Sequence, residues 1–146
     1  EISTLNTLIA TTIDSITGYE NSAKDIQSER FREIFRQRAD DRQRVVQELR
    51  DEVRRLGGDP EDGGSFLGKA HQRFEDAKSA VTGGNDESII NEVERGEDYL
   101  KEKFEAALNG DTLSGEARSV VERCYQSVKS GHDQISQIKH GMEANS

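Results

Sequence analysis

The chain has 146 residues, of which 32% are hydrophobic and 34% charged, and its formal net charge is −9. This length suits a single domain covering residues 1–146. The acidic balance argues against nucleic-acid binding, which depends on clustered lysine and arginine. Arginines concentrate between residues 30 and 55, but aspartates and glutamates interrupt them, so this segment predicts a helix with mixed-charge faces.

The sequence also lacks the signals of a membrane or disulfide-bonded protein. No apolar run approaches the roughly 20 residues that a membrane span needs, and no signal peptide is visible. The one cysteine, Cys124, excludes an internal disulfide. We therefore expect a cytoplasmic protein without membrane contact.

Apolar residues at spacings of three and four predict two long helices in the first part of the chain, over residues 5–26 and 31–56. A tight polar turn is expected between them, near residues 25–28. The second helix is expected to stop at Gly57-Gly58-Asp59-Pro60, because glycine adopts the left-handed cap conformation and proline prevents continuation.

The second part of the chain predicts one short and two long helices. A short amphipathic helix is expected over residues 66–81, ending at Gly83-Gly84. A long helix then begins near Asn85 or Asp86 and ends at Asn109-Gly110. Ser114 is expected to cap the last long helix, whose apolar stripe runs over residues 117–138.

These elements predict an all-α fold of two helical hairpins joined by about thirty residues. One long crossover between the second and third helices, here carrying a short helix, is the connectivity of a ferritin-like four-helix bundle. An up-down-up-down bundle would not need residues 57–85.

A set of short motifs resembles an uncharacterised bacterial ferritin-like family. The motifs are Leu56-Gly57-Gly58-Asp59-Pro60, Gly64-Ser65, Gly68, His71 and Glu94-Arg95-Gly96-Glu97-Asp98. The resemblance implies a four-helix bundle that forms a homo-oligomer, and it implies no established activity. The wider ferritin-like superfamily binds two metal ions between its helices and oxidises or stores iron or activates oxygen.

The superfamily supplies its metal ligands as one glutamate from each of two helices and Glu-x-x-His from each of the other two. At about 100° per residue, Glu97 lies on the buried stripe of its helix. Glu20 and His132 lie at stripe edges, and Asp41 lies well to the side. If both long middle helices start at the same end, Glu97 is level with position 40, and His132 is level with about Asn91.

Two arginines occupy the stripe where the second helix should supply metal ligands. Arg38 and Arg42 flank the level predicted for Glu97. A di-metal site needs several carboxylates to balance its charge, and inward arginines oppose this. The sequence therefore predicts buried charge-assisted pairs among these three side chains and a degenerate metal site.

Other side chains with reactive chemistry have simpler interpretations. Tyr19 and Tyr125 are expected to be core aromatics whose hydroxyls reach water. Cys124, at the centre of its stripe, is expected to be a small buried hydrophobe. His71 has no second ligand at zinc spacing and is expected to cap or pack.

Three functional hypotheses follow. The first is a non-enzymatic ferritin-like bundle without cofactor, expected to be a homodimer, that acts as a structural or interaction module under stress. The second is an iron-binding oxidase or iron-handling protein that uses Glu20, Asp41, Glu97 and His132. The third is an adaptor that presents an acidic helix to a basic partner through Asp86, Glu87, Glu92, Glu94, Glu102 and Glu105.

Overall fold

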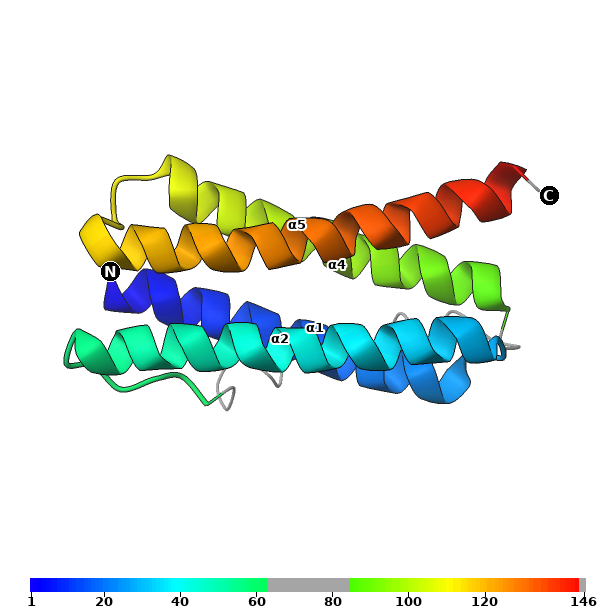
Figure 1. Ribbon diagram of the computed structural model, residues 1–146, viewed down its shortest axis with the longest axis horizontal. Coiled ribbons are helices and arrows are strands. Elements are labelled where there is room, and N and C mark those ends of the chain that lie inside the picture. Colours follow the sequence, from blue (N-terminus) through cyan, green and yellow to red (C-terminus); the bar gives the residue numbers. More distant parts are fainter. Residues whose placement is uncertain (63–84, 145–146) are drawn as a thin grey trace.

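The computed structural model describes residues 1–62 and 85–144, and within these ranges it is all-helical, without strands. The helices form a four-helix bundle (Figure 1): α1 (Ile2–Asp25), α2 (Glu29–Arg55), α4 (Asp86–Asn109) and α5 (Gly115–Ala144). The predicted long helices are confirmed. The short helix expected over residues 66–81, and His71 within it, lie outside the described residues.

The four helices occupy the corners of a square in cross-section. Helix α1 packs against α2 and α4, and α5 packs against the same two helices. Helices α2 and α4 therefore face each other across the diagonal. They also run in the same direction along the bundle, as the colour gradient in Figure 1 shows.

The turn between α1 and α2 is held by a side chain of the turn itself and by one from the start of α4. Ser28 caps α2 by accepting a hydrogen bond from the Phe31 N–H, 3.2 Å away. The carboxylate of Asp86 accepts hydrogen bonds from the backbone N–H groups of Gln27 and Ser28, at 2.9 and 3.1 Å. The start of α4 is thereby fixed to the turn of the first hairpin.

Helix α2 ends where the double glycine predicted it. Gly58 N–H donates to the Val53 carbonyl and Gly57 N–H to the Arg54 carbonyl, both at 3.0 Å, which is the Schellman pattern. Gly57 has a φ of +86°, in the left-handed region that favours glycine. At the other end of the connection, Asn85 caps α4 by accepting from the N–H groups of Glu87 and Ser88.

The second hairpin has a different register from the one expected. Helix α5 begins beyond the end of α4 (Figure 1), because residues 110–114 run along the bundle axis before the chain turns back. His132 was expected to lie level with about Asn91, but its imidazole contacts Asp98, further along α4. In the same register, Lys139 donates to Glu94. Ser114 precedes α5, and its hydroxyl donates to the Glu1 carboxylate at 3.1 Å.

The core is a continuous apolar cluster to which all four helices contribute, with Phe35, Leu49 and Phe104 among its fully buried members. Among the described helices, none is both long and apolar enough to cross a membrane.

Gly57→Ala tests the cap of α2. A Cβ at this position meets no atom within 4 Å, so its cost is that of the left-handed backbone alone. We expect the free energy of unfolding to fall by about 1 kcal/mol, measured by urea denaturation. Gly141→Ala in α5, which also meets open space, is the control and should be neutral or slightly stabilising. Equal effects of the two substitutions would contradict this account.

Candidate functional site at the centre of the bundle

The centre of the bundle contains a charged residue on the inward face of α2. The buried positions of this helix include Phe35, Ala39, Arg42, Val46 and Leu49, with spacings of four, three, four and three. Arg42 thus falls where the heptad pattern places a core side chain. Its side chain is fully buried, with a relative exposure of 0%.

The partner of Arg42 is Glu97, which reaches it across the diagonal from α4. Arg42 Nη1 lies 2.9 Å from Glu97 Oε1, and Arg42 Nη2 lies 2.8 Å from Oε2. This is the two-pronged geometry that matches a guanidinium to a carboxylate. Glu97 is 1% exposed. Glu97 therefore points into the bundle, as its position on the stripe predicted, and its carboxylate binds Arg42.

Helix α1 supplies two hydroxyls to the same layer. Tyr19 donates to Glu97 Oε1 at 2.7 Å, and Arg42 Nη1 donates to Ser15 Oγ at 2.8 Å. The Arg42 guanidinium carbon also lies 5.8 Å from the centroid of the Tyr19 ring, within reach of a cation–π contact. Arg42 Nε is the one guanidinium nitrogen without a hydrogen-bond partner among the described residues.

The tyrosine prediction was wrong in one respect. We expected the Tyr19 hydroxyl to reach water, but the residue is 3% exposed and its hydroxyl is bonded to Glu97. Burial, together with the negative charge of Glu97, raises the pKa of Tyr19 well above its ordinary value. Tyr19 is therefore a neutral hydrogen-bond donor at physiological pH.

The protonation state of Arg42 is equally fixed. Burial by itself lowers the pKa of this guanidinium, but the charge of Glu97 and the hydrogen bonds between the two groups outweigh burial, and the net direction is upward. The centre of the bundle thus holds a permanent cation.

The fourth helix contributes space rather than a side chain. Gly131 of α5 is buried against the ion pair. A Cβ built there would lie 2.5 Å from Arg42 Nη2 and 3.4 Å from Glu97 Oε2. The sequence analysis missed Gly131, although its position between Val128 and Ile135 on the stripe is a signal that could have found it.

The second predicted arginine lies elsewhere. Arg38 does not bond to Glu97: its Nε donates to Gln134 Oε1 of α5 at 2.8 Å, and its Nη1 lies 3.4 Å from Asp41 Oδ2. It sits one turn of α2 away from Arg42. Its partners are at the seam between α2 and α5, so the expectation that both arginines face Glu97 was wrong.

The remaining candidate metal ligands do not converge on Glu97. Glu20 is exposed, because Tyr19 takes the inward position of that turn. Asp41 is half-buried and pairs with Arg38 and Arg44. His132 Nε2 lies 2.7 Å from Asp98 Oδ1, and its Nδ1 lies 3.3 Å from Asp133. In residues 1–62 and 85–144, no three His, Cys, Asp or Glu side chains come together as a metal site.

Two other reactive side chains have polar partners. Cys124 is 1% exposed and its thiol donates to Glu48 Oε2 at 3.3 Å, and burial with this neighbouring carboxylate raises the pKa of the thiol. Tyr125 donates to Glu105 at 2.6 Å, which raises the pKa of this tyrosine to about 12. Neither environment favours a nucleophile or a redox residue.

The acidic helix α4 uses four of its six candidate carboxylates within the bundle. Asp86 binds the α1–α2 turn, Glu92 pairs with Arg95, Glu94 with Lys139, and Glu105 with Lys101 and Tyr125. Glu87 and Glu102 are exposed.

Gly131→Ala tests the contact between α5 and the ion pair. The added methyl group forces a guanidinium that is already bonded on two sides to move, so we expect a loss of roughly 1–3 kcal/mol in the free energy of unfolding. Urea denaturation measures the free energy of unfolding of this variant and of the control Gly141→Ala, whose added methyl group meets open space on the same helix. A Gly131→Ala protein as stable as wild type would show that the helices are not held this closely.

The sequence comparison covers most of this site. The family described as a domain of unknown function, DUF2383, matches residues 1–110, a range that includes Ser15, Tyr19, Arg42 and Glu97. No curated protein matches the sequence. Because the match covers well over half of the chain, the protein belongs to this uncharacterised family, DUF2383.

Proposed function

We propose that this protein is a non-enzymatic ferritin-like bundle that serves as a structural or interaction module. The observation that carries the proposal is the Arg42–Glu97 pair across the bundle diagonal. The common direction of α2 and α4 supports the ferritin-like connectivity, since two parallel helices that follow each other need a long return connection.

The chemistry of the ion pair opposes a di-metal centre. Both carboxylate oxygens of Glu97 already accept hydrogen bonds, two from Arg42 and one from Tyr19. A metal ion at this carboxylate would have to displace a guanidinium whose cost of burial is compensated by this same pair. A permanent cation beside the metal would add electrostatic repulsion. The arrangement is therefore suited to holding helices, and metal binding is the alternative that experiment must test.

The pair also explains how a charge-rich chain selects one arrangement. Arg42 belongs to the first hairpin and Glu97 to the second, so the two hairpins dock with both charges satisfied in one axial register. A buried polar pair that fixes register at some expense of stability is a documented use of such groups. This role requires neither substrate nor cofactor.

Iron loading tests the proposal against the metal-binding alternative. After aerobic purification with added Fe²⁺ and removal of free metal, elemental analysis should find well below one iron per chain, against roughly two in a di-metal bundle. Glu97→Gln provides the matched control, because it removes the charge and keeps the shape. Stoichiometric iron that is lost in Glu97→Gln would establish the alternative.

The structural role of the pair is tested separately by a single and a double substitution. Glu97→Ala leaves the Arg42 guanidinium buried without its counterion, so we expect a loss of roughly 3 kcal/mol or more, measured by urea denaturation. Replacing both residues, as Arg42→Met with Glu97→Met, removes the stranded charge and should recover most of this loss. A Glu97→Ala protein with an unchanged urea midpoint would refute the role of the pair.

A further inference from the structure

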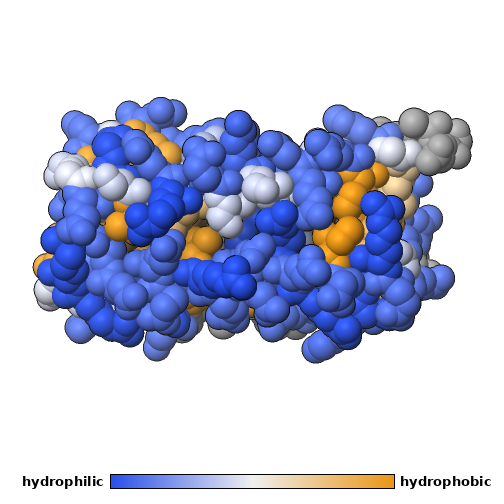
Figure 2. Space-filling view, viewed as in Figure 1, coloured by the Kyte–Doolittle hydropathy of each residue, from blue (hydrophilic) through white to orange (hydrophobic). Residues whose placement is uncertain are grey.

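A groove runs along the seam between α2 and α5 on the face shown in Figure 2. It consists of two hollows of about 420 and 450 Å³. Gln134 and Gln137 of α5 line both, so the two hollows are neighbours along the seam. Figure 1 shows α5 diverging from α2 toward its C-terminal end, where the smaller hollow lies.

One end of the groove is apolar. Phe31 and Ile34 of α2 and Ile138 and Met142 of α5 line the smaller hollow, and all four are only partly buried against the core. Apolar side chains reach the surface between these two helices at the right of Figure 2. A cluster of this kind, contributed by two helices, marks an interaction surface more strongly than scattered apolar residues do.

The groove is also cationic, in a chain whose net charge is −9. Arg30 lines the apolar end, and Arg38 and Lys129 line the other hollow, where Asp133 is the one acidic residue. Asp133 is engaged by His132, and Arg38 by Gln134 and Asp41. Arg30 and Lys129 are exposed, and in the described part of the chain neither forms an ion pair with a carboxylate. The Arg30 guanidinium carbon lies 5.6 Å from the centroid of the Phe31 ring, beside the apolar end of the groove. The groove thus combines apolar contacts with two available positive charges.

The length of the groove fits a helix. Lys129 and Met142 are thirteen residues apart on α5, which corresponds to ~20 Å at the helical rise. A partner helix of about four turns has this length. Amphipathic helices commonly bind by laying an apolar face in a groove between two helices, with charges at the rim setting orientation and specificity.

We propose that the α2–α5 groove binds an amphipathic helix of another protein that carries carboxylates at both ends of its apolar face. The apolar face covers Phe31, Ile34, Ile138 and Met142, and the carboxylates pair with Arg30 and Lys129. A second copy of this chain fits less well, because two grooves face to face would oppose their cations. This proposal is independent of whether the centre of the bundle binds metal.

The test uses the whole chain and two synthetic peptides. The first is a fluorescently labelled helix of about 14 residues, spanning ~20 Å, with leucines at spacings of three and four and glutamates at both ends. The second has lysines in place of the glutamates. Fluorescence anisotropy should show saturable binding of the glutamate peptide, weakened by added salt, and at least roughly tenfold weaker binding of the lysine peptide.

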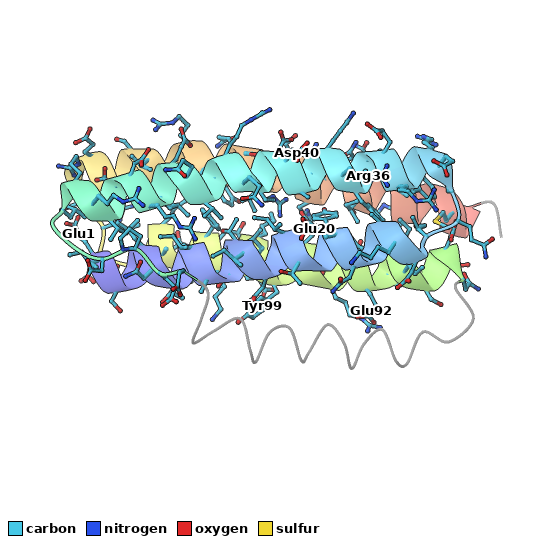
Figure 3. The ribbon with its side chains drawn as sticks, turned by 90° about the horizontal axis from the view of Figure 1, so that it is seen from below. Glu1, Glu20, Arg36, Asp40, Glu92 and Tyr99 are labelled. Atoms are coloured by element: carbon cyan, nitrogen blue, oxygen red, sulfur yellow. The ribbon has the colours of Figure 1, made fainter. Side chains whose placement is uncertain are left out.

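Charge reversals on the protein locate the binding site. Arg30→Glu and Lys129→Glu should each weaken binding of the glutamate peptide by roughly tenfold. Arg36→Glu is the matched control: it makes the same change in net charge on the same helix as Arg30, but Arg36 is exposed and lies on the outer side of α2 (Figure 3). It should leave binding within about twofold.

Four results would overturn the proposal: no saturable binding of the glutamate peptide up to ~1 mM, equal binding of the two peptides, equal weakening by all three reversals, or a wild-type dimer that Ile34→Glu dissociates. The last result would assign the groove to a second copy. Circular dichroism of each variant confirms that it is folded before binding is compared.

Discussion

The Arg42–Glu97 pair is the constraint on which the rest of this bundle depends. Each charge is buried, and removing either group from water costs several kcal/mol, which the other charge offsets together with the hydroxyls of Ser15 and Tyr19. The core above and below is apolar, and apolar contacts are less directional than a bidentate ion pair, so they discriminate less sharply between one axial register of the two hairpins and the next. A slip of one helical turn, ~5.4 Å, would strand both charges. We therefore expect the pair to contribute specificity for one arrangement more than net stability.

The other two helices, α1 and α5, carry residues that accommodate the pair at its level in the bundle. Helix α1 supplies the hydroxyls of Ser15 and Tyr19, which bond to one member each. Helix α5 supplies Gly131, where the Cβ of any other residue would overlap the Arg42 guanidinium. The hydroxyls and the two charges lie within residues 1–110, the range that matches the family, whereas Gly131 lies beyond it. The polar layer thus has one part that the family match covers and one part that is a feature of this chain's last helix.

The sequence predicted the long helices closely and the site partly, and the difference has a physical cause. The end of α2 at Gly57-Gly58 and the start of α4 at Asn85 are encoded locally, so they could be read directly, whereas the cap at Ser28 was not identified from the sequence. The inward orientation of a residue at the centre of an apolar stripe is also predictable, because a small error in helix phase leaves it buried. Arg42 and Glu97 were found for this reason. The orientation of a residue at a stripe edge is less predictable, because neighbouring residues differ by about 100° around the helix. In α1, Tyr19 points inward and Glu20 is exposed. The level of His132 depended on the path of residues 110–114, and the partners of Arg38 depended on how closely α5 approaches α2. Neither is encoded within one helix.

A fold of this type does not specify a function, which resides in the particular side chains that it positions. In ferritin-like proteins that bind metal, the chemistry lies between the helices, where ligands converge. Here that space is filled: Glu97 accepts from Arg42 and Tyr19, Arg42 also donates to Ser15, and α5 lies against the pair. A ligand entering the centre would have to break these charge-assisted hydrogen bonds and leave a buried charge without its partner. The seam between α2 and α5 has the opposite character, with partly exposed apolar side chains and two cations without carboxylate partners in the described residues. This contrast between a closed centre and a partly open seam is the reason for proposing recognition at the surface in preference to chemistry in the interior.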